Sequence, residues 1–165
     1  MSTVRILGID PGFGRLGICI LDKEKNKETL VFSSCVETSK KESFENRLTI
    51  IGNTLEKIIK KYKPTELAIE TIFFTTNQKT IITVAEVRGV CIYLSSLYKL
   101  SIHEYSPPEI KLSVAGHGKG TKEDVAHMIQ KILMGQIKKG LLDDELDAIA
   151  IALTHSAHRK IITWK

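Results

Sequence analysis

The alternation of apolar and polar positions along the chain predicts a mixed α/β protein. Short runs of β-branched and aliphatic residues bounded by turn residues predict five strands, at residues 4–10, 16–21, 29–36, 67–70 and 102–105. Longer segments with apolar residues three or four positions apart, or opened by proline, predict five helices. These helices are expected at residues 44–63, 78–98, 108–114, 122–134 and 144–158.

The order of these elements predicts how they assemble. Three strands in succession suggest an antiparallel meander, and the later alternation of strands and helices suggests parallel additions to it. The expected fold is therefore a five-stranded mixed sheet flanked by helices. No linker, internal repeat or low-complexity tract interrupts the pattern, so we expect a single domain over residues 1–165, with a core at about 4–158.

Composition narrows the possible functions only a little. Lys and Arg outnumber Asp and Glu by 24 to 19, which permits a nucleic-acid partner without requiring one. Cys19, Cys35 and Cys91 are widely spaced and form no zinc pattern. The opening residues do not resemble a secretory leader, and no apolar stretch suggests a membrane span. We expect a cytoplasmic protein that does not associate with a membrane.

Two acidic residues close apolar strands. Asp10 ends the first strand, on the face that carries Ile6 and Gly8, and Glu70 ends the strand at 67–70. A carboxylate next to buried residues is costly unless something pairs with it. Each residue alone has another explanation, because Asp10 could cap the Pro11-Gly12 turn and Glu70 could be a solvated edge charge.

The last helix begins with an acidic cluster. Acids favour the first turn of a helix for reasons of capping and dipole alone. Asp144 and Asp147, however, are three residues apart and share one face, and the following alanines suit close packing on a sheet.

These four carboxylates, Asp10, Glu70, Asp144 and Asp147, could converge in one pocket. Carboxylates at close range repel one another and require a cation. Oxygen ligands without clustered Cys or His favour a hard ion such as Mg²⁺ or Mn²⁺. Two such ions suit phosphodiester hydrolysis, one activating water and the other stabilising the leaving 3′ oxygen.

Five motifs, in order along residues 5 to about 156, resemble the RuvC family of Holliday-junction resolvases. They are Ile6-Leu7-Gly8-Ile9-Asp10-Pro11-Gly12; Ala68-Ile69-Glu70 with Phe73, Phe74 and Asn77; Glu86-Val87-Arg88-Gly89-Val90; the basic segment from Lys111 to Met128; and Asp144 to Ala152 with Thr154-His155. The departures are Val87, where alanine is common, and Gly120, Thr121 and Asp124, which fall in the segment expected to face DNA.

The resemblance implies a ribonuclease-H-like fold and a structure-specific endonuclease of DNA recombination and repair. It implies two Mg²⁺ ions per subunit, with Mn²⁺ able to substitute, held by the four carboxylates. By selecting Asp144 and Asp147 from the acidic cluster, the resemblance leaves Asp143 as the expected helix cap and Glu145 as a surface acid. A homodimer would nick opposed strands of a four-way junction symmetrically and leave 5′-phosphate and 3′-hydroxyl ends. Junction-binding and branch-migration helicase proteins of the RuvA and RuvB type are the further partners it implies.

Several residues are candidates for contact with DNA. Lysines flanking a glycine-rich loop suit phosphates, and an aromatic residue beside a catalytic acid suits an unpaired base. The expected contacts are Phe73, Asn77, Arg88, Lys111, Lys119 and Lys122. Arg88 lies on a helix that could instead line the dimer seam. The five histidines are scattered along the sequence, and we expect none of them to bind metal.

Three other functions share parts of this sequence pattern. An actin-like or sugar-kinase ATPase also opens with a strand ending in Asp-x-Gly, but needs about twice this length. A ribonuclease-H-like nuclease acting on RNA or other branched nucleic acid has the same acids, although Phe73 and the basic segment favour DNA. A catalytically silent junction-binding module would not need the complete carboxylate set.

Overall fold

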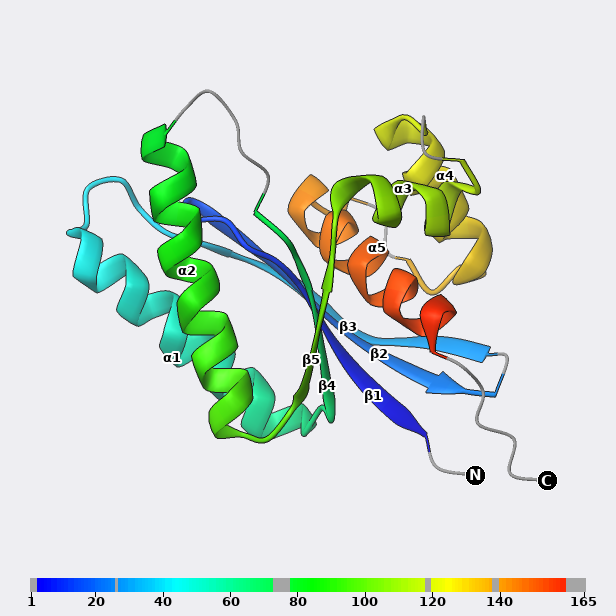
Figure 1. Ribbon diagram of the computed structural model, residues 1–165, viewed down its shortest axis with the longest axis horizontal. Helices are drawn as coiled ribbons and strands as arrows, with labels where there is room; N and C mark the ends of the chain where they lie inside the picture. Colours follow the sequence, from blue (N-terminus) through cyan, green and yellow to red (C-terminus); the bar gives the residue numbers. More distant parts are fainter. Residues whose placement is uncertain (1–2, 26, 73–77, 118–119, 138–139, 160–165) are drawn as a thin grey trace.

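Five strands form one mixed sheet in the order β3-β2-β1-β4-β5 (Figure 1). The computed structural model describes residues 3–25, 27–72, 78–117, 120–137 and 140–159. The sheet consists of β1 (Val4–Asp10), β2 (Arg15–Glu24), β3 (Lys27–Glu37), β4 (Glu66–Glu70) and β5 (Ser101–Tyr105). The five strands expected from the sequence are all confirmed.

Strand direction follows the connections. The short turns β1–β2 and β2–β3 give antiparallel pairs, with Asp10 opposite Gly17. The strands β1, β4 and β5 are parallel to one another, because a helix links each newly added strand to the preceding part of the chain. Parallel pairing places the carboxyl ends of β1 and β4 side by side, with Ile9 opposite Ile69.

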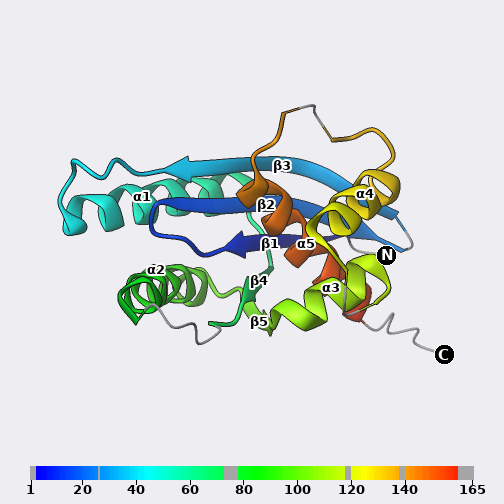
Figure 2. The same ribbon diagram turned by 90° about the horizontal axis from the view of Figure 1, so that it is seen from above.

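Helices cover both faces of the sheet (Figure 2). One face carries α1 (Phe44–Tyr62) and α2 (Gln78–Leu97), and the other carries α3 (Pro107–Ala115), α4 (Lys122–Ile132) and α5 (Asp143–His158). Each strand divides its side chains between two hydrophobic cores, so that Leu7 packs toward α1 and α2 whereas Ile6 packs toward α5.

The helix α5 lies unusually close to the sheet, because glycines and alanines line the contact. A Cβ atom at Gly8 would overlap the carbonyl oxygen of Ala148 and lie 2.8 Å from the Cβ of Ala152. A Cβ atom at Gly17 would overlap the carbonyl oxygen of Asp144. Only glycine at these two strand positions lets the first three turns of α5 approach β1 and β2 so closely.

The helix α2 differs from the expectation that no stretch of the chain is apolar enough to suggest a membrane span. The segment Thr80–Leu97 of α2 is long and apolar enough to cross a membrane, judged by length and composition only, and 22% of it is buried. The helix belongs to the fold, since Val87 and Cys91 are buried in the core between the sheet and α1. Its apolar character reflects this buried face together with an exposed one.

Candidate active site

Asp10 and Glu70 lie at the carboxyl ends of the neighbouring parallel strands β1 and β4. Asp10 alternates with Ile6 and Gly8, and Glu70 alternates with Ala68, so both side chains stand on the face covered by α5. The structure thus brings together two strand-end acids that are sixty residues apart in the sequence.

The other two acids come from the first turns of α5. The close contact at Gly17 holds the backbone of Asp144 against β2. Asp147 follows one turn later and approaches Lys122, whose Nζ lies 3.2 Å from Oδ2 of Asp147. Nη1 of Arg15, at the start of β2, lies 3.4 Å from Oδ2 of Asp144.

Electrostatics show that the four carboxylates share one site. The pKa of Asp10 is raised from 3.8 to about 7, first by burial and then by the charges of Asp147, Glu70 and Asp144. The pKa of Glu70 is also raised, by burial and then by Asp147. Conversely, the charge of Asp147 raises the pKa of Lys122. The site therefore carries an excess of negative charge, which Lys122 and Arg15 partly offset.

This donor set fits a hard divalent cation. The four side chains offer carboxylate oxygens, which are the ligands that Mg²⁺ and Mn²⁺ favour. A bound cation would relieve the mutual repulsion that raises the pKa of Asp10. Metal binding is therefore a natural way to stabilise Asp10 in its ionised form.

A pocket of about 270 Å³ opens beside the acids, on the side of α3 and α4. Its lining includes the acids Glu70 and Asp147 together with Lys111 and Lys122. The side chain of Lys122 is largely exposed, so it can also reach an anion outside the site. Two of the three lysines expected to bind DNA therefore lie next to the acids. Lys119 lies outside the described residues, as do Phe73, Phe74 and Asn77.

Arg88 lies deeper than expected for a DNA-binding residue. Only 16% of its side chain is exposed. Its Nε donates a hydrogen bond to the backbone carbonyl of Glu70 at 3.1 Å, and its Nη2 lies 2.7 Å from Oε1 of Glu104 on β5. Contact of Arg88 with DNA stays a prediction, while the contacts present favour a role in fixing the end of β4.

The departures from the family pattern before α4 have a structural role. Thr121 is the N-cap of α4, and its side chain accepts a hydrogen bond from the backbone N–H of Asp124. The carboxylate of Asp124 in turn accepts from the backbone N–H of Thr121 at 2.9 Å. This capping box fixes the start of α4 and so positions Lys122, the next residue. Gly120, which directly precedes Thr121, is buried.

Two expectations about the acidic cluster are wrong. Leu142, not Asp143, is the N-cap of α5, and Asp143 is an exposed first residue of the helix. Glu145 is not a free surface acid, since its Oε2 accepts a hydrogen bond from the hydroxyl of Ser33 on β3 at 2.9 Å. Both differences arise because α5 packs against β2 and β3, which the sequence of the helix alone does not reveal.

Sequence reasoning also missed Arg15. It lies at the start of β2, immediately after the turn that follows Asp10, and contacts Asp144. The signal was present in the hairpin, because an antiparallel turn returns the chain to the end of the strand that it leaves.

Comparisons with known proteins agree with this geometry. The family described as "Crossover junction endodeoxyribonuclease RuvC" matches residues 6–155. A protein of that name from Fusobacterium nucleatum is 41% identical over 153 residues, covering 92% of this chain and 80% of the relative.

Solved structures agree as well. The structure described as T. thermophilus RuvC in complex with Holliday junction substrate superposes with a TM-score of 0.86 at 30% identity, covering 93% of both chains. The yeast mitochondrial Holliday junction resolvase Ydc2 has a TM-score of 0.69 at 16% identity, covering 93% of this chain and 78% of that one, which shows a shared fold. The expected ribonuclease-H-like fold is thereby confirmed, and the chain belongs to the RuvC family of crossover junction endodeoxyribonucleases.

Proposed function

We propose that this protein resolves four-way DNA junctions in recombination and repair, by metal-dependent hydrolysis of phosphodiester bonds in opposed strands. The observation that carries the proposal is the convergence of Asp10, Glu70, Asp144 and Asp147 from β1, β4 and α5 in a chain of this family. Hydrolysis breaks the bond between phosphorus and the 3′ oxygen, and leaves a 5′-phosphate and a 3′-hydroxyl.

The four carboxylates are proposed to hold two Mg²⁺ ions, with Mn²⁺ as a substitute. Bound there, such ions supply a nucleophilic hydroxide at neutral pH and stabilise the leaving oxygen. The backbone of Asp10 and of Glu70 is held by strand pairing, and that of Asp144 by the glycine contact on β2, so the main chain that carries these ligands is fixed before substrate arrives. Rigid ligands require little rearrangement during the reaction.

The cations around the acids are suited to hold the scissile strand. Lys111 and Lys122 line the pocket beside Glu70 and Asp147, and Arg15 stands next to Asp144. Phosphates that approach the acids need such positive charge, because the carboxylates alone repel them. Lys119, Phe73 and Asn77 are proposed as further DNA contacts from the sequence pattern alone.

The decisive experiment is cleavage of a synthetic four-way junction, compared with linear duplex and with an RNA-containing hybrid, with and without Mg²⁺. Asp147→Asn should keep binding the junction, while the rate of nicking falls by at least about 100-fold because a metal ligand is lost. Each tenfold decrease in rate corresponds to about 1.4 kcal/mol of lost transition-state stabilisation. Asp143→Asn is the matched control, with the same substitution at an exposed position one turn earlier in the same helix.

The outcomes separate the possible functions. Symmetric nicking of the junction by the wild type and by Asp143→Asn, but not by Asp147→Asn, supports the proposal. Near-native cleavage by Asp147→Asn contradicts the metal-site assignment. Preferential cutting of the RNA-containing hybrid contradicts the proposed substrate.

We also propose a homodimer, in which two copies of α2 meet. Ile82, Tyr93 and Leu97 are exposed and fall along one stripe of this helix, with Tyr93 65% exposed. Gly89 lies in the same stripe with nothing near its Cβ direction, so a partner backbone can approach there. An apolar stripe on an exposed helix suits a two-fold contact, and a two-fold dimer suits a two-fold junction.

Charge substitution in this stripe tests the dimer. Leu97→Glu should shift the protein from dimer to monomer in sedimentation experiments. Met134→Glu introduces the same charge at another exposed apolar residue and should leave the dimer intact. A wild type that sediments as a monomer at all concentrations would contradict the assignment.

Action in the cytoplasm and cooperation with RuvA- and RuvB-type proteins are proposed from family membership.

A further inference from the structure

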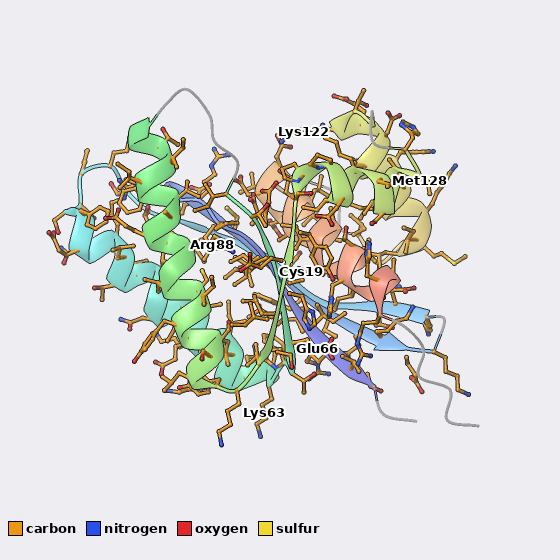
Figure 3. All side chains as sticks on the ribbon, viewed as in Figure 1. Cys19, Lys63, Glu66, Arg88, Lys122 and Met128 are labelled. Carbon is orange, nitrogen blue, oxygen red and sulfur yellow. The ribbon has the colours of Figure 1, made fainter. Side chains whose placement is uncertain are left out.

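A second cluster of metal-ligating side chains lies at the opposite ends of the strand and helix that carry the acids. Glu66 opens β4, which Glu70 closes, and His155 follows Asp147 by eight residues on α5. These separations correspond to roughly 13 Å along the strand and roughly 12 Å along the helix. Figure 3 labels Glu66 at the end of the sheet away from Lys122. The two groups are therefore separate sites on shared elements.

The cluster is held by short contacts among three elements. Nε2 of His155 lies 2.6 Å from Oε2 of Glu66, and its Nδ1 lies 2.7 Å from the hydroxyl of Tyr105 on β5. The ring of His103, also on β5, stacks on His155 with centroids 4.2 Å apart. His155 is 3% exposed and Glu66 is 14% exposed. The period of two along β5 places His103 and Tyr105 on the face that α5 covers.

We propose that Glu66, His103 and His155 form a binding site for a transition-metal dication, with Zn²⁺ as the best-matched ion. One ligand atom from each lies within 4.8 Å of the others. Tetrahedral ligands of one ion at about 2.1 Å are about 3.4 Å apart, so small side-chain shifts bring the three atoms onto a shared ion. Two imidazoles and one carboxylate favour Zn²⁺ over Mg²⁺, which prefers oxygen ligands only. The site is distinct from the four catalytic carboxylates.

The surroundings supply what such a site needs beyond its three ligands. Tyr105 can accept a hydrogen bond from Nδ1–H of His155, which leaves Nε2 free to bind the ion and fixes the ring. With the ion at Nε2, the single proton of the neutral imidazole is on Nδ1, so the ring carries no charge. A pocket of about 430 Å³ opens over Glu66, His103 and His155, which admits the ion and a water as the fourth ligand.

Two contacts have to change when the ion binds. The hydrogen bond between Nε2 of His155 and Oε2 of Glu66 opens, because both side chains become ligands of the ion. Nε of Arg159, at the end of α5, lies 2.9 Å from Oε2 of Glu66 and provides the positive charge that this carboxylate faces. A dication replaces that charge, and the arginine, which is partly exposed, moves into solvent. Binding then joins β4, β5 and α5 through metal bonds and stabilises the folded protein.

The experiment is a titration of the whole chain with Co²⁺ in the presence of saturating Mg²⁺, which keeps the acidic site filled. Tetrahedral Co²⁺ with nitrogen ligands absorbs visible light strongly, and displacement by Zn²⁺ then gives the affinity for Zn²⁺. We expect one ion per chain and a higher melting temperature with Zn²⁺. The same Co²⁺ absorption is expected from Asp147→Asn, because this substitution lies in the acidic site and leaves Glu66, His103 and His155 unchanged.

Three variants make the test specific. His103→Phe keeps an aromatic ring against His155 but removes a ligand, and should weaken binding by more than about 100-fold. Tyr105→Phe removes only the hydrogen bond to His155 and should weaken binding about 10- to 100-fold. His127→Ala, at an exposed histidine on α4, should bind as the wild type does.

Two results would overturn the proposal. One is equal affinity for Co²⁺ in the wild type and in His103→Phe. The other is loss of the Co²⁺ signal in Asp147→Asn, which would place the ion among the catalytic acids. Neither result depends on cleavage of DNA, so failure of this proposal and failure of the proposed function are distinguishable.

Discussion

The guanidinium of Arg88 on α2 donates a hydrogen bond to the backbone carbonyl of Glu70 at the end of β4. The same side chain pairs with Glu104 on β5, so one residue joins a helix to two neighbouring strands beside the acids. The bond acts on the backbone that carries a proposed metal ligand. Arg88 is therefore a positioning residue in this structure.

Replacement of Arg88 should impair cleavage without changing how DNA binding responds to salt. In Arg88→Ala the carbonyl of Glu70 loses its partner, and the free energy of unfolding should fall by about 1–3 kcal/mol. Urea unfolding, junction cleavage and the salt dependence of junction affinity are the measurements. If Arg88 contacted a phosphate, its replacement would instead reduce the slope of junction affinity against salt concentration by about one.

Glu104→Gln provides the control for Arg88→Ala. It removes the charge of the partner while leaving the hydrogen bond from Arg88 to Glu70 available. Cleavage near the wild-type rate is expected. Equal loss of activity in both variants would argue against positioning through the carbonyl of Glu70.

Substitution of Gly17 should disturb the site through packing alone. A Cβ atom there would overlap the carbonyl oxygen of Asp144. Gly17→Ala should push the first turn of α5 off the sheet, cost about 1–3 kcal/mol of stability and slow cleavage. Thermal unfolding and junction nicking measure both effects. Gly14→Ala is the matched control, since nothing lies within 4 Å of its Cβ direction, and it should behave as the wild type.

Stability of the metal-free protein should fall as the pH rises toward neutrality. The pKa of Asp10 is raised from 3.8 to about 7 in the folded state. Between these values the folded protein keeps a proton that the unfolded chain has lost, so the free energy of unfolding decreases with increasing pH. The total effect is on the order of 4 kcal/mol at most, at about 1.4 kcal/mol per pKa unit.

Melting temperatures in chelator at about pH 5 and about pH 8, compared between wild type and Asp10→Asn, measure this effect. The variant carries no titrating group at this position, so its advantage over the wild type should appear at the higher pH. Added Mg²⁺ should stabilise the wild type more at the higher pH. A variant that is no more stable than the wild type at the higher pH would contradict the raised pKa.

Removal of the charge of Lys122 should affect DNA and metal in opposite directions. Its ammonium contacts Asp147 and partly offsets the charge of the acids. Lys122→Ala should therefore tighten Mg²⁺ binding while weakening junction binding and reducing its salt slope by about one. Calorimetry with Mg²⁺ and junction titrations at several salt concentrations measure the two effects. Weaker binding of both ligands would show that Lys122 acts mainly by holding α4 in place.

The sequence by itself determined the elements and the four acids that we propose as metal ligands. Alternation along residues 4–10 placed Asp10 on the face of Ile6 and Gly8, and the spacing of Asp144 and Asp147 placed both on one side of a helix. These are local properties, because side-chain direction repeats every two residues in a strand and every 3.6 in a helix. The ordered motifs then identified the family.

Only the tertiary structure decided which distant residues meet. The sequence predicted that Arg88 contacts DNA or lines a dimer seam, and only the structure reveals its contacts with Glu70 and Glu104. The histidines looked scattered, yet β5 and α5 bring His103 and His155 together beside Glu66. Strand order and the close packing of α5 set these contacts. Both depend on which distant segments pair with each other, and the residue pattern within one segment does not reveal its partner.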